Sequence, residues 1–186
     1  MSRFFLFCCF FIPVLCPETQ ASDEGVLNLL QGYEWKLPEQ AFHQLGEAAV
    51  SSLIEIAEDE NQVNFIRARA AAALTLFPSD AAWDYYESEI TVGINRVAID
   101  RVAIDRVRRR QLVQNFCTSF ALTRPQQVEA MVMPLLREPD AHLRVKSARC
   151  LSKIDGDQSR EALATYRASI TEPWEARAAG FNMEIK

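Results

Sequence analysis

The sequence concentrates positive charge in one short run of arginines: Arg101, Arg106, Arg108, Arg109 and Arg110. A guanidinium group donates parallel hydrogen bonds to a carboxylate or a phosphate, so this arginine run could bind an acidic protein or anionic lipid head groups. Asp100 and Asp105 are too few to pair with all of it. The alternative is a solvated helix face whose arginines pair with acids of neighbouring helices. We treat the five arginines as candidate partner-binding residues.

Other patterns that could support metal binding or catalysis are incomplete. The segment 155–159 begins like a calcium-binding loop, but Arg160 takes the place of the required glycine and Tyr166 that of the last carboxylate. We interpret it as a turn and a helix cap. The only histidines, His43 and His142, have no zinc-site spacing, and there is no nucleophile elbow, phosphate loop or dinucleotide fingerprint. The sequence therefore predicts no catalytic residue, no metal and no cofactor.

Cys117 and Cys150 are the cysteines that remain once a predicted N-terminal leader is removed. Both fall at apolar positions of predicted helices, where cysteine behaves as a small buried hydrophobic residue. We favour that interpretation. A disulfide is the alternative, because the leader directs the chain to an oxidising compartment.

Helical periodicity dominates the sequence that must position these residues. Apolar side chains recur three and four positions apart, and glycine and proline are few and lie between the periodic segments. The predicted helices span 23–31, 38–45, 49–57, 63–76, 80–90, 108–122, 125–136, 141–154, 157–170 and a last one from 173. No segment has the pattern of a strand, so the sequence predicts an all-α fold.

A longer pattern repeats across these helices. Segments 49–59 and 130–140 both begin with alanine and end on aspartate. After the first comes an apolar residue followed by Arg67, and after the second an apolar residue followed by Arg144. Small residues at helical spacing follow each of these two pairs. This layout resembles the HEAT-type repeat, including its bilin-lyase-like subgroup, over about residues 38–154. The resemblance implies a short α-solenoid of about four antiparallel helix pairs, a HEAT-like superhelix.

A tetratricopeptide array is the second choice, because the tetratricopeptide pattern does not include the aspartate and apolar-arginine positions. The resemblance to the HEAT-type repeat weakens in two places. In the last pair, Trp174 and Glu175 replace the apolar-arginine pair. In the middle, residues 96–100 recur identically as 101–105, which lengthens one unit. Five residues are not a whole number of helical turns, so we interpret the duplication as a tolerated insertion at a helix end or loop. The alternative is an extension that carries a binding surface.

Residues 1–21 follow the order of a signal peptide, with Arg3, an apolar run over 4–15 and small residues before a cleavage site at Ala21. The run would rise about 18 Å as a helix, less than the roughly 30 Å of a bilayer core. A lipoprotein signal at Cys16 is the alternative, although Leu15 is larger than such signals prefer. We expect a mature domain over 22–186 that is secreted or periplasmic, in a bacterial envelope. Membrane association is expected only if Cys16 is lipidated or the leader is uncleaved.

Composition limits the classes of function that the sequence supports. The 186 residues carry 20 basic and 25 acidic groups, a net charge of −5, which argues against a general nucleic-acid binder. A helical-repeat array presents an extended curved face that suits protein partners. The sequence thus predicts a non-catalytic protein-binding adaptor or scaffold, whose partner is a protein with an acidic surface. The alternatives are a bilin-lyase-like chaperone that positions a ligand, and a structural envelope component.

Overall fold

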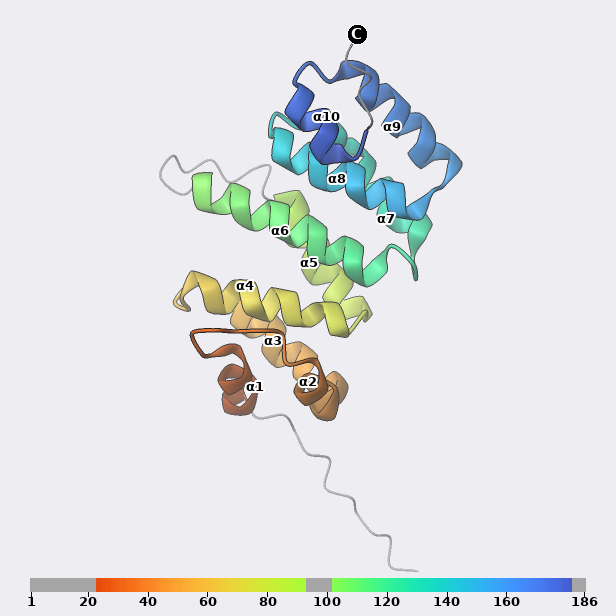
Figure 1. Cartoon of the computed structure of the whole chain (residues 1–186). Helices are drawn as coiled ribbons and strands as arrows, with labels where there is room; N and C mark the ends of the chain where they lie inside the picture. The colour runs from red at the N-terminus through yellow and green to blue at the C-terminus, as the bar shows by residue number, and fades with distance from the viewer. Residues whose placement is uncertain (1–22, 93–101, 182–186) are drawn as a thin grey trace, which may run out of the picture.

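The computed structural model describes residues 23–92 and 102–181, and throughout this part of the chain the only regular elements are helices joined by short turns (Figure 1). The α-helices are α1 (Asp23–Leu30), α2 (Glu39–Leu45), α3 (Ala49–Glu58), α4 (Asn64–Ala73), α5 (Asp80–Val92), α6 (Val102–Phe120), α7 (Pro125–Val132), α8 (Ala141–Ile154), α9 (Asp157–Ser169) and α10 (Pro173–Ala179). Short 3₁₀ helices adjoin them at η1 (Gly46–Ala48), η2 (Leu74–Leu76) and η3 (Met133–Arg137). The predicted all-α fold is confirmed.

Local sequence signals set many of the helix ends. Pro125 and Pro173 open α7 and α10, where the missing N–H of proline costs nothing. Gly180 ends α10 in the left-handed region at φ 90°, which glycine adopts without strain. Asp140 caps α8 by accepting hydrogen bonds from the backbone N–H groups of its first turn, and α8 has the predicted bounds 141–154.

The predicted helix 63–76 is α4 followed by η2, and two further helices differ from their predicted extents. The predicted helix 125–136 is α7 followed by η3, because Pro134 cannot donate an N–H and its ring blocks a continuing α-helix. The predicted helix 108–122 begins earlier, at Val102, so residues 102–105 of the second duplicate copy belong to the first turn of α6. The first copy, at 96–100, lies outside the described residues, as do the predicted leader and Cys16.

Helices that follow one another pack together: α3 on α4, α5 on α6, and α7 with η3 on α8. Figure 1 shows α4, α6 and α8 stacked at the front, with α3 and α5 behind them. Between the two sets lies an apolar core in which Leu53, Tyr86, Phe116 and Phe120 are fully buried. Trp83 packs edge-on against both phenylalanines, with ring centroids 4.8 and 5.1 Å apart. Burial of each large side chain contributes about 1.5–3 kcal/mol, which holds the helices in place.

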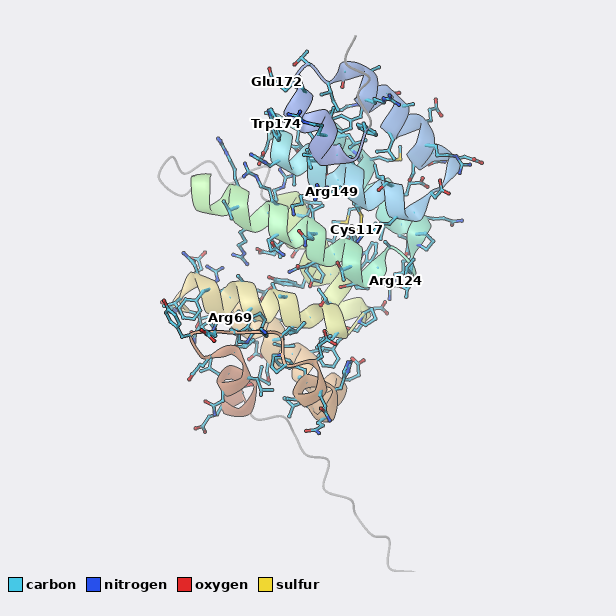
Figure 2. The ribbon with its side chains drawn as sticks, in the orientation of Figure 1. Arg69, Cys117, Arg124, Arg149, Glu172 and Trp174 are labelled. Carbon is cyan, nitrogen blue, oxygen red and sulfur yellow. A yellow bond between two sulfur atoms is a disulfide. The ribbon has the colours of Figure 1, made fainter. Side chains whose placement is uncertain are left out.

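A disulfide between Cys117 and Cys150 joins α6 to α8 (Figure 2). The two Cα atoms are 5.6 Å apart, and both residues are buried, as the sequence predicted. The bond itself corrects the favoured interpretation of two unpaired thiols and matches the alternative. Within residues 23–92 and 102–181, no helix combines the length and the apolar character needed to cross a bilayer.

Candidate protein-binding surface

The C-terminal part of the arginine run is engaged inside the molecule. Arg110 donates from Nε and Nη2 to the two carboxylate oxygens of Asp140, at 2.6 and 2.8 Å. Arg109 donates from Nε to the carbonyl oxygen of Ile90 at 2.8 Å and from Nη2 to Glu138 Oε1 at 3.2 Å. Burial acts to raise the pKa of Asp140, but the bonds from Arg110 and from backbone N–H groups outweigh it and hold this pKa below its usual value. These two arginines therefore fasten α6 to the start of α8.

The other members of the arginine run differ in their surroundings. Arg108 donates to the carbonyl oxygen of Ala57 at 3.1 Å and lies 2.7 Å from Glu89 Oε2. Arg106 is exposed and forms no ion pair with a side chain that the structure describes. Arg101 lies outside the described residues. The arginines of this run are thus not gathered on one free surface, and a role in partner binding stays a prediction for them.

Arg144 links α8 to α10 by an ion pair, as Arg110 links α6 to the N-cap of α8. Arg144 donates from Nε and Nη2 to Glu175, at 2.7 and 2.8 Å, and from Nη1 to the carbonyl oxygens of Glu138 and Pro139. The hydroxyl of Tyr166 donates to the same Glu175 at 2.6 Å. Burial acts to raise the pKa of Glu175, but the bonds from Arg144 and Tyr166 hold it below its usual value. Glu175, which departs from the apolar-arginine pattern of the repeat, thus accepts hydrogen bonds from both Arg144 and Tyr166.

One surface left open by these contacts is a groove between α4 and α6, with a volume of 660 Å³. Much of its wall is small or apolar: Trp35, Ala68, Ala71, Ala72, Val107 and Leu112. The groove exists because α4 is rich in alanine, and alanine side chains are too short to fill the space toward α6. We call it the α4–α6 groove.

Apolar surface faces solvent at the groove and beside it. Val107 on α6 lines the groove and leaves 61% of its surface exposed. Phe65 on α4 is 55% exposed and packs against the guanidinium of Arg69, which lies 4.8 Å from the ring centroid. An exposed apolar side chain on a concave surface, as Val107 is, is typical of sites that bind another molecule.

One buried polar atom of a residue that lines the groove has no hydrogen-bond partner among the described residues. Asn115 on α6 lines the groove and is only 5% exposed. Its Oδ1 accepts a hydrogen bond from Gln111 Nε2 at 3.0 Å, but its Nδ2 is buried and donates to no described atom. A buried donor without an acceptor costs about 1–3 kcal/mol, so an acceptor supplied by a bound molecule would be stabilising here.

The charge of the groove is positive, although the whole chain carries −5. Segments 64–73 and 106–115, which face each other across it, contain arginines and no acidic residue. Arg67 donates from Nε to the carbonyl oxygen of Ala57 at 3.1 Å. Arg69 donates from Nη1 to the carbonyl oxygens of Leu30, at the end of α1, and of Gly32, and its guanidinium lies over the ring of Trp35 in the segment that joins α1 to α2 (Figure 2). Neither reaches a carboxylate among the residues that the structure describes.

Other candidate sites are taken up by internal contacts. Asp155 and Asp157 of the calcium-like segment both pair with Arg160. Across the described ranges, no three His, Cys, Asp or Glu side chains are grouped as metal ligands would be. A second groove of 790 Å³ lies between η3 and α9, but the buried hydroxyl of Tyr166 in its wall already donates to Glu175. The α4–α6 groove is thus the candidate site.

Sequence reasoning identified Arg108 of this groove but missed its other residues. The signals were weak: an alanine-rich helix and a single asparagine, Asn115, among the apolar residues of α6. That Nδ2 lacks a partner depends on where Gln111 and α4 lie, which spacing along the chain does not reveal. In comparisons with known proteins, no family model matches the chain and no curated protein does either.

Proposed function

We propose that the protein is a non-catalytic adaptor or scaffold that binds another protein, and that part of this partner occupies the α4–α6 groove. The observation that carries the proposal is the groove itself, an open apolar surface with an unpaired buried donor, Asn115 Nδ2, in its wall. Such a surface binds by shape and hydrogen bonding and needs no catalytic group.

The architecture in this proposal is a short HEAT-like α-solenoid. Two observations support it. Helices that follow one another pack as pairs. The ion pairs of Arg110 with Asp140 and of Arg144 with Glu175 join elements about one helix pair apart, as contacts between successive repeats would. Because each pair packs only on its neighbours, one side of such an array stays available to a partner.

Export from the cytoplasm belongs to the same proposal. It rests on the leader-like composition of residues 1–21 and is supported by the disulfide between Cys117 and Cys150, a bond typical of proteins outside the reducing cytosol. We therefore place the partner in the periplasm or the extracellular medium.

Photo-crosslinking in the producing cell tests this function. A photoreactive residue replaces Ala68, which is exposed and lines the groove, and a matched control replaces Asp84, which is exposed on α5. We expect a discrete protein adduct from position 68 that is absent from position 84 and disappears when Val107→Glu is added. Variant Val107→Gln, of equal size and no charge, is expected to retain it.

Two results would contradict the proposal. Equal labelling from both positions would mean that the contacts are nonspecific. No adduct from position 68 would mean that no partner occupies the groove. An adduct made only of two copies of this chain would instead support the structural envelope component.

A further inference from the structure

The unpaired donor in the groove limits what can bind there. Asn115 Nδ2 is closed off from solvent and lacks a described acceptor, so a ligand that enters the groove can supply one where the side chains around Asn115 give way. The carbonyl groups inside a helix are already used by that helix, whereas those of an extended chain are free. An extended peptide can therefore supply the missing acceptor from its main chain, whereas a helical ligand would have to supply it from a side chain.

Charge limits the ligand further. Arg67 and Arg69 line the groove, and each uses only part of its guanidinium group, for backbone carbonyls. Arg106 is exposed beside Val107 on α6. No acidic residue of the described ranges lines the groove, so a ligand carboxylate would meet several guanidinium donors and no repulsion. A basic ligand would be repelled by the same guanidinium groups.

The apolar wall sets the third requirement. Ala68 and Ala72 on α4 and Val107 with Leu112 on α6 line the same space, which is large enough for one or two branched or aromatic side chains. In an extended peptide, alternate side chains point to opposite sides. An apolar residue can then face the groove while an acidic neighbour stays near the rim.

Resting on the proposed function, we infer that the occupant of the α4–α6 groove is an extended acidic segment of the partner protein. An apolar side chain of that segment lies between α4 and α6, a main-chain carbonyl accepts from Asn115 Nδ2, and a carboxylate pairs with Arg67 or Arg69. Specificity for acid comes from these two arginines of α4, which pair with no described carboxylate, whereas Arg108, Arg109 and Arg110 are ion-paired.

A peptide selection tests this inference and does not require the partner to be identified first. A phage library of random twelve-residue peptides is selected on the purified chain, and enriched peptides are synthesised with a fluorophore for polarisation measurements. We expect enriched sequences to combine an apolar residue with adjacent Asp or Glu. Replacing those acids by Asn or Gln should weaken binding about tenfold, as expected for a lost charge-assisted hydrogen bond.

Matched variants of the chain localise the binding. Val107→Glu adds a carboxylate to the groove and should weaken binding about tenfold, whereas Val107→Gln should stay within about threefold of the original. Asn115→Leu removes the buried donor and should also weaken binding about tenfold, while its melting temperature is kept or raised because an unsatisfied polar group is lost. This opposite effect on stability and binding separates a ligand-binding role from a structural one.

Several outcomes would overturn the inference. They are enrichment of basic or neutral peptides, no enrichment at all, or binding that Val107→Glu and Asn115→Leu leave unchanged. Sedimentation of the chain alone that changes with Val107→Glu would mean that a second copy fills the groove. None of the peptide outcomes contradicts the proposed adaptor function, which fails only if crosslinking from position 68 yields no specific adduct with another protein.

Discussion

Replacing Glu175 by glutamine should destabilise the protein far more than the loss of one surface charge would. The side chain of Glu175 is 4% exposed and that of Arg144 is 22% exposed, and Tyr166 donates to the same carboxylate. In Glu175→Gln, the amide keeps the size of the side chain but presents an N–H₂ group to donors that require an acceptor. The guanidinium of Arg144 then stays in place without its counter-charge.

The size of the effect follows from burial. Removing one partner of a buried ion pair costs about 3–5 kcal/mol, and we reduce this to about 2–4 kcal/mol because Arg144 retains some contact with water and with two backbone carbonyls. For a chain of 186 residues, this corresponds to a melting temperature lower by about 6–12 °C. The matched control is Asp80→Asn, because Asp80 pairs with Arg124 but its side chain is 87% exposed. We expect that change to cost less than about 1 kcal/mol.

The assay is urea unfolding followed by circular dichroism at 222 nm, repeated across pH. Because the pKa of Glu175 lies below its usual value near 4.5, its stabilisation is complete above that value and is lost as pH falls through the lower folded pKa. The original chain should therefore lose stability steeply below about pH 4. Glu175→Gln should show a shallower loss, since this group no longer takes up a proton on unfolding. Equal stabilities of Glu175→Gln and Asp80→Asn at pH 7 would refute this account of the network.

Two further predictions concern contacts that join other elements. Reduction of the disulfide, or the double change Cys117→Ala and Cys150→Ala, should lower the free energy of unfolding by about 2–4 kcal/mol, and urea midpoints that are equal with and without dithiothreitol would contradict this. Gly156→Ala should cost about 1–2 kcal/mol, because the new Cβ would lie 2.8 Å from Oε1 of buried Glu129, which accepts a hydrogen bond from the Ser159 backbone N–H. The same change in a Glu129→Ala background should cost much less, and equal costs in the two backgrounds would show that Glu129 is not the obstacle.

The helices were predictable because their signals are local. Apolar spacing, the cap at Asp140 and the prolines that open α7 and α10 all act within one or two turns, and α8 has its predicted bounds. Pro134 is also a local signal, and it indicates an interruption of the predicted helix 125–136. The apolar series over the same residues favoured a continuous helix instead. Local steric exclusion outweighs periodicity at such a position.

The functional surface was less predictable because it depends on residues of different helices that lie far apart in the sequence. From the sequence, the arginine run could bind a partner or pair with acids of neighbouring helices, and in the structure Arg109 and Arg110 pair with Glu138 and Asp140, just before α8. Conversely, Asn115 looked like an ordinary helix residue, and only the packed structure leaves its Nδ2 unpaired. The packing of the helices decides which charges are free and which donors are unsatisfied. The sequence pattern predicts the helices but not the side-chain contacts between them.

Binding in the α4–α6 groove can be observed by nuclear magnetic resonance of the Asn115 side-chain amide, recorded on the ¹⁵N-labelled chain and assigned by its absence from Asn115→Leu. On addition of the acidic peptide that binds most tightly in the selection, we expect the Nδ2 hydrogens to shift downfield and to exchange more slowly with water, because they gain an acceptor. The backbone amides of α4 and of residues 106–115 should shift with them. An unchanged Asn115 resonance, with shifts confined to α7–α10, would contradict binding in the α4–α6 groove.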